Sequence, residues 1–84
     1  MSTRWRSFAI HWDPAALYVL YQLLPSAAAA VDRAVLRFAE AGEGDLEWDP
    51  PYHRLRASTH DALLAIDGPA ERIIVIRLYR ARRG

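Results

Sequence analysis

Two residue types with distinctive chemistry are absent from this sequence, namely cysteine and lysine. Without cysteine the chain can form neither a disulfide framework nor a thiolate metal site, and the absence fits a reducing compartment. Without lysine all eleven Lys/Arg positions are arginines. Arginine binds phosphate well, but it cannot accept a proton near neutral pH. A proton acceptor in this chain therefore has to be a histidine or a carboxylate.

Long hydrophobic runs and targeting signals are also lacking. The longest apolar stretch, AALYVLYQLL, is too short to span a bilayer. The basic N-terminus, MSTRWRSFAIHWD, is followed by too few apolar residues for a secretory signal. We therefore expect a soluble, cytoplasmic protein that does not contact a membrane. Its 84 residues, 52% of them hydrophobic, suffice for a single domain over residues 1–84.

The motifs that mark metal, nucleotide and hydrolase sites are missing. The three histidines, His11, His53 and His60, lie far apart and none has a histidine four residues on. This spacing predicts no metal site. The sequence contains no P-loop, no glycine-rich dinucleotide fingerprint and no G-x-S-x-G turn. We expect no cofactor.

The N-terminal half predicts a strand followed by two helices. Apolar residues alternate at Phe8, Ile10 and Trp12, which is typical of a strand with one buried face. Asp13 followed by Pro14 is a strong helix start, because the carboxylate can cap free amide groups and proline has helical φ. This helix is expected to reach about residue 24, and a second, amphipathic helix to begin at residue 25 and end near residue 42.

The C-terminal half predicts three strands. The acidic segment GEGDLEWDPP is expected to be a loop ended by its two prolines. Strands are expected from about residue 52, over residues 61–66 and over RIIVIRLYR. The order βααβββ predicts an α+β domain, with a helical hairpin packed on one face of a small, mainly antiparallel sheet.

The first helix is apolar on nearly all sides. Its core-facing stripe is expected to contain Leu17, Leu20, Tyr21 and Leu24. Tyr18 and Val19 then lie on the opposite side, where exposed apolar area usually marks an interface. We expect these two residues to contact a partner, either another protein or a second copy of the chain.

The charged residues are unevenly distributed. Residues 40–49 hold five acids and no base, whereas residues 50–84 hold seven arginines and three acids. Strand alternation places Arg54 and Arg56 on one face. The same alternation places Arg77 and Tyr79 on the face of the buried β-branched residues of the last strand. Two interpretations stay open, a solvated sheet face or an anion-binding groove.

The segments SFAIHWDPAALYVLYQLLP, HRLRASTHDALLAID and ERIIVIRLYRARR occur in the order of the RelE/ParE toxin superfamily of bacterial type II toxin-antitoxin systems. The chain resembles this family over roughly residues 6–83. The RelE branch cuts messenger RNA in the ribosome, using lysines and arginines on the sheet and a tyrosine near the C-terminus. The ParE branch is associated with inhibition of DNA gyrase and lacks that set. The resemblance implies that an antitoxin neutralises the protein.

The resemblance can be carried over to individual positions. Arg54 and Arg56 fall where RelE-type lysines stand. Asp61 falls where an arginine is usual, which inverts the charge. Ala81 occupies the position of the terminal arginine, between Arg80 and Arg82, and no tyrosine follows for the C-terminal position.

Cleavage by a 2′-hydroxyl needs a proton acceptor, a donor and a cation at the phosphate, and arginines supply only the cation. The candidates for proton transfer are His53, His60 and Asp61, although His53 is expected on the face opposite Arg54. The expected anion-binding residues are Arg54, Arg56, Arg80 and Arg82. We expect a toxin that binds a macromolecular target such as DNA gyrase or ribosomal mRNA. The alternatives are a ribosome-dependent mRNA endonuclease with an arginine-dominated site and a non-toxic nucleic-acid-binding domain.

Overall fold

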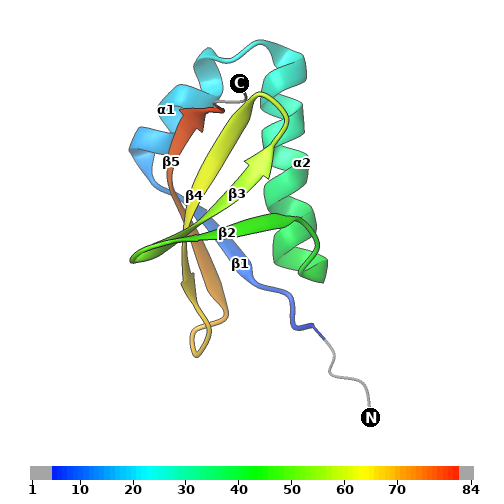
Figure 1. Ribbon diagram of the computed structural model, residues 1–84, viewed down its shortest axis with the longest axis vertical. Coiled ribbons are helices and arrows are strands. Elements are labelled where there is room, and N and C mark those ends of the chain that lie inside the picture. Colours follow the sequence, from blue (N-terminus) through cyan, green and yellow to red (C-terminus); the bar gives the residue numbers. More distant parts are fainter. Residues whose placement is uncertain (1–4, 82–84) are drawn as a thin grey trace.

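The computed structural model describes residues 5–81, which form one mixed sheet covered by two helices (Figure 1). The elements in chain order are β1 (Ala9–Trp12), α1 (Pro14–Gln22), α2 (Pro25–Ala41), β2 (Asp45–Asp49), β3 (Tyr52–Ala57), β4 (His60–Asp67) and β5 (Arg72–Arg80). The strand order across the sheet is β1-β5-β4-β3-β2. β1 runs parallel to β5, and the other neighbouring pairs are antiparallel. The α+β class and the two helices on a mainly antiparallel sheet are therefore confirmed.

Local signals define both helices. The Asp13 carboxylate accepts a hydrogen bond from the Ala15 N–H at 2.9 Å and caps α1, whose first residue is a proline. α2 also begins with proline and ends at Gly42, where φ is +69° and the glycine N–H donates to the Phe38 carbonyl. A side chain at Gly42 would be strained at this φ, and its Cβ would lie 2.6 Å from the Trp5 ring.

The core lies between the helices and one face of the sheet. From α2 it receives Val31 and Val35, and from the sheet Leu55, Leu64 and Ile73, all essentially inaccessible to solvent. α1 contacts β5, whereas α2 contacts β1, β3 and β4. Within residues 5–81 no helix covers the opposite face of the sheet, and it is there that the arginines of β3 lie. No helix within residues 5–81 is long and apolar enough to cross a membrane.

One strand was not expected from the sequence. The acidic segment predicted to be a loop contains β2, which pairs antiparallel with β3 from Asp45 opposite Arg56 to Asp49 opposite Tyr52. The prediction was wrong because Asp, Glu and Gly favour loops. The pairing of Leu46 with the buried Leu55 outweighs that tendency, because it extends the apolar face of the sheet.

A β-bulge changes the facing of β5. Leu63 pairs with Arg77 and Leu64 pairs with Val75, so Ile76 is the extra residue. Before the bulge, Val75 faces the core. In a regular strand the next core-facing residues would be two and four positions further on, but the bulge makes Leu78, three positions further on, the next residue to face the core. The expectation that Arg77 and Tyr79 share a face with Val75 was therefore wrong, since the bulge moves both onto the open face.

α1 is rotated relative to the prediction. Val19, Leu20 and Leu23 pack against the core, whereas Tyr21 and Leu24 are 78% and 75% exposed. The heptad-like stripe predicted from the sequence could not fix the rotation, because both sides of this helix are apolar.

Candidate functional site

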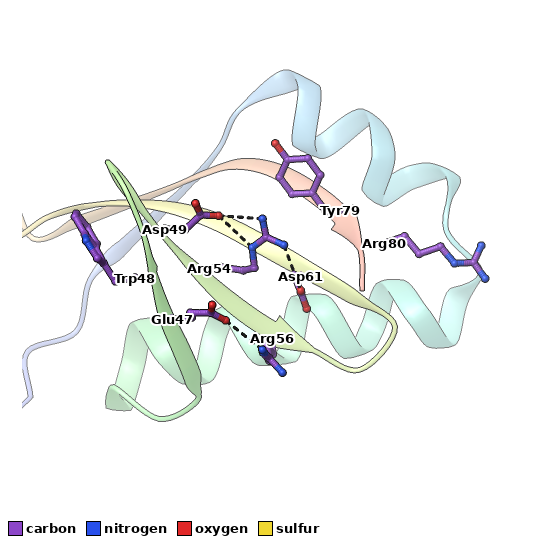
Figure 2. Close-up of a pocket in the computed structure, with 8 residues that line it drawn as sticks. All are labelled: Glu47, Trp48, Asp49, Arg54, Arg56, Asp61, Tyr79 and Arg80. Carbon is purple, nitrogen blue, oxygen red and sulfur yellow. Dashed lines mark hydrogen bonds and ion pairs between the residues drawn. The ribbon is translucent and has the colours of Figure 1, made fainter. Parts of the chain in front are cut away.

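The open face of the sheet contains a broad depression of about 790 Å³ between β2 and β5. Figure 2 shows that its side chains come from four adjacent strands. The lining residues are Glu47, Trp48, Asp49, Arg54, Arg56, Asp61, Tyr79 and Arg80. The sequence had predicted that Arg54 and Arg56 share a face, and strand alternation with the buried Leu55 between them confirms it.

Arg54 lies at the centre of this depression and is engaged on three sides. Its Nε and Nη2 groups donate to Oδ2 of Asp49 at 3.2 and 2.9 Å. On the other side Nη1 lies 3.8 Å from Oδ2 of Asp61, a carboxylate that is only 7% exposed. The guanidinium carbon also lies 5.3 Å from the centre of the Tyr79 ring, in cation-π range. Arg54 is thus held by two carboxylates and one aromatic ring.

Arg56 is paired with β2 in the same way. Its Nη2 donates to Oε2 of Glu47 at 3.1 Å, and its Nε lies 3.8 Å from Oδ2 of Asp45. The hydrogen bond to Glu47, followed by the charge of Asp45, raises the pKa of Arg56 above its usual value. The arginine guanidinium is charged near neutral pH in any case, and these neighbours favour its charged form further.

These pairs decide the electrostatics of the open face. Around the two guanidiniums stand four carboxylates, those of Asp45, Glu47, Asp49 and Asp61. A phosphate approaching either arginine would meet excess negative charge and would have to displace a carboxylate that the strand holds in place. In the patch that the sequence suggests as anion-binding, the positive charges of Arg54 and Arg56 are therefore neutralised by carboxylates of the same chain.

Arg80, near the end of β5, does not complete that patch. Figure 2 shows the Arg80 side chain pointing away from Arg54, toward the connection between the helices. The register explains this direction, because Arg80 pairs with His60, which in turn pairs with the buried Ala57 on the helix side. The other residue predicted to join the patch, Arg82, lies outside the described residues.

Tyr79 is the residue that sequence reasoning missed. The bulge at Ile76 puts its ring on the open face, 40% exposed and beside Arg54. A bulge leaves no recognisable signature in RIIVIRLYR. The one available signal was the arginine at position 77, since a guanidinium is rarely buried against a core.

The three candidates for proton transfer are not brought together. The His53 ring lies 4.9 Å from that of Trp48, and alternation along β3 directs it to the face opposite Arg54, as expected. His60 lies at the start of β4 with its Nδ1 2.9 Å from the Thr59 hydroxyl oxygen. Asp61 is buried under the Arg54 guanidinium. Among residues 5–81, no group of three or more metal-ligating side chains is close enough to hold an ion.

The two residues predicted to bind a partner differ in exposure. Tyr18 is 66% exposed, whereas Val19 is partly buried against the core, and both line a pocket beside β5, so their role in partner binding stays a prediction. The exposed apolar side chains of this region instead follow a spacing of three residues. They are Tyr18 and Tyr21 in α1 and Leu24 in the connection to α2, which together we call the α1 stripe.

The fold matches solved structures over nearly the whole chain. The RelBE2 toxin-antitoxin complex of Mycobacterium tuberculosis superposes with a TM-score of 0.77 at 15% identity, covering 94% of this chain and 98% of that one. This chain has the fold of a RelE toxin. The intact E. coli RelBE complex gives 0.71 at 17% identity, covering 92% of this chain and 100% of that one. The isolated E. coli RelE toxin gives 0.71 at 13% identity, covering 93% and 88% respectively.

Comparisons by sequence give no match, in contrast to the comparison by structure. No protein-family model matches the sequence, and no curated protein matches it. The resemblance to RelE inferred from the order of strands and helices is therefore confirmed at the level of the fold. On the open face of this RelE-like sheet, Arg54 and Arg56 are paired with four carboxylates, and we call this group the acid-paired arginine cluster. Because a fold alone does not determine a function, the functional proposal is based on this cluster.

Proposed function

We propose that this protein is the toxin of a type II toxin-antitoxin system, and that it acts in the cytoplasm by binding a macromolecular target without cutting RNA. The RelE-like fold supports the first part, since two of the matched structures are toxin-antitoxin complexes. The second part rests on one observation, the engagement of Arg54 and Arg56 by four carboxylates.

RNA cleavage needs chemistry that this open face does not bring together. A 2′-hydroxyl must lose a proton while cations stabilise the charge on the phosphate. Both guanidiniums already neutralise carboxylates, and Asp61, the carboxylate closest to a suitable position, is buried in an ion pair with Arg54. None of the residues that line the depression is a histidine. A phosphodiester bound here would gain little transition-state stabilisation.

The second candidate is a ribosome-dependent mRNA endonuclease. The observation in its favour is the position of Tyr79, which the bulge places against Arg54 with its phenol on the open face (Figure 2). A phenol can donate a proton to a leaving group. This reading requires that the target displace Asp49 from Arg54.

Induced expression with mRNA integrity as the readout separates the two functions. We expect growth arrest with intact mRNA, both in cells and on programmed ribosomes, with a RelE toxin as the positive control for cutting. Cutting that disappears in both Arg54→Ala and Tyr79→Phe would defeat the binding function and establish the endonuclease. Absence of growth arrest would leave only a non-toxic nucleic-acid-binding domain.

The partner that neutralises the toxin is proposed to cover the α1 stripe. Tyr18, Tyr21 and Leu24 are at least 66% exposed, and exposed contiguous apolar residues are typical of interfaces. Coexpression with the short open reading frame next to the toxin gene tests the idea. A complex weakened by Tyr21→Ser but unaffected by Ser26→Ala supports it. Self-association of the isolated chain through the same residues would contradict this proposal and would show that a second copy of the chain covers the stripe.

A further inference from the structure

A second concave site lies at one end of the sheet, and Arg80 lines both this site and the open-face depression. It has a volume of about 500 Å³ and lies between the α1–α2 connection and the turn that joins β3 to β4. The residues around it are Gln22, Leu23, Leu24, Ser26, Ala27, Ser58, Thr59, His60 and Arg80. The sheet end contributes only polar residues, whereas the helical side contributes Gln22 and Ser26 together with all the apolar ones.

The sheet fixes the polar end of this pocket. His60 and Arg80 are register partners in the β4–β5 pair, so their side chains stand next to each other, with Cβ atoms about 5 Å apart. The Ala81 N–H donates to the Thr59 carbonyl at 2.9 Å, which ties the end of β5 to the β3–β4 turn. The His60 and Arg80 side chains therefore leave the sheet at adjacent positions on the same face.

The charge of this pocket differs from that of the arginine cluster. None of the described residues that line it is acidic. Within residues 5–81, no carboxylate forms an ion pair with Arg80, whereas Arg54 and Arg56 are each paired twice. An anion therefore meets an unpaired guanidinium here, with no internal carboxylate to displace.

The pair formed by Thr59 and His60 adds a hydrogen-bond donor. Oγ1 of Thr59 lies 2.9 Å from Nδ1 of His60. The direction of this hydrogen bond depends on the tautomer of the ring, and when the hydroxyl donates to Nδ1 the ring proton lies on Nε2, the nitrogen that remains for a ligand. In that tautomer His60 offers an N–H, and Arg80 offers the planar fork that suits phosphate oxygens.

We propose that this pocket is a phosphate-binding site, with Arg80 and His60 as the ligands of the phosphate oxygens. The apolar wall of Leu23, Leu24 and Ala27 suits the sugar or base of a nucleotide that carries the phosphate. The site does not depend on the proposed toxin function, because none of its ligands belongs to the acid-paired arginine cluster. Arg80 thereby receives a role on the helix side of the sheet, away from Arg54 and Arg56.

Amide chemical shifts of the full chain in solution test the site. The probes are inorganic phosphate and uridine 5′-monophosphate, with uridine as the uncharged control. We expect saturable shifts at Thr59, His60 and Ala81 with both phosphates and none with uridine. Tighter binding of the nucleotide identifies a nucleotide as the natural ligand, and equal binding identifies free phosphate.

Variants assign the ligands. Loss of a charge-assisted hydrogen bond weakens binding by about tenfold to a hundredfold, the effect expected for Arg80→Ala. His60→Gln, which keeps a donor, should weaken it less than His60→Ala. Arg77→Ala is the matched control, since Arg77 is also exposed and unpaired within the described chain but lies on the other face. Equal weakening by Arg77→Ala, or shifts confined to Arg54 and Arg56, would overturn the proposal, as would no saturable binding.

Discussion

Removal of Arg54 should destabilise the protein far more than removal of Arg56, although both arginines lie on one strand and one face. The Arg54 guanidinium is the cation beside Asp61, whose side chain is 7% exposed. In Arg54→Ala that carboxylate loses the Arg54 guanidinium, in a site that water barely reaches. The carboxylates beside Arg56 are 56% and 72% exposed and can be hydrated in its absence.

The magnitude follows from the burial of Asp61. A buried charged group that loses a partner costs about 1–3 kcal/mol. Asp61 makes other interactions in this structure, so we expect the lower part of that range, about 1–2 kcal/mol. For a domain of this size each kcal/mol lowers Tm by about 4–8 °C, so Arg54→Ala should lose about 5–15 °C. Loss of an exposed pair such as that of Arg56 is usually barely measurable.

Thermal and urea unfolding of the two variants measure this difference directly. A third variant identifies the cause, because Asp61→Asn has nearly the same shape and no charge. If the lost charge compensation of Asp61 is what destabilises Arg54→Ala, adding Asp61→Asn should restore part of the lost stability, and the cycle should show coupling of about 0.5–3 kcal/mol. Equal Tm losses in Arg54→Ala and Arg56→Ala, or no rescue by Asp61→Asn, would refute the reasoning.

Three further outcomes are expected. Replacing Glu47 and Asp49 by glutamine and asparagine should strengthen binding of single-stranded RNA and steepen its salt dependence in fluorescence anisotropy; unchanged affinity would show that β2 does not shield the arginines. Gly42→Ala should cost about 1–2 kcal/mol in urea unfolding, because φ is +69° and Trp5 blocks the added methyl, and a smaller loss would mean that Trp5 moves aside. Tyr21→Ser should leave Tm within a few degrees of the parent, since the ring is 78% exposed, whereas a large drop would place it in the core.

The fold was largely predictable because its signals are local. The cap at Asp13, the proline at residue 25 and the glycine at residue 42 set the helix ends, and alternation set the faces of β1 and β3. β2 could not be predicted because its composition favours a loop and its pairing with β3 is a tertiary effect. The rotation of α1 could not be predicted either, because Val19 and Tyr18 are both apolar enough to face the core.

The candidate site was less predictable than the fold. The sequence places Arg54 and Arg56 together, but the acids that pair with them belong to a segment that was expected to be a loop. A count of charges along the chain separates an acidic run from a basic half. The β2–β3 pairing brings the two together, with Asp45 opposite Arg56 and Glu47 opposite Arg54. Linear charge patterning therefore predicted an anion-binding face where the folded protein has ion pairs.

The two sides of the sheet consequently offer very different sites to an anion. On the open face a phosphate competes with carboxylates that are part of the same sheet and are never diluted away, so binding there requires β2 to shift or a ligand with additional contacts. At the sheet end, Arg80 and His60 face a pocket whose described lining holds no acid, and no internal group has to leave. A target that engages the open face is therefore expected to do so through an extensive surface, whereas a small phosphate should enter the pocket beside Arg80 first.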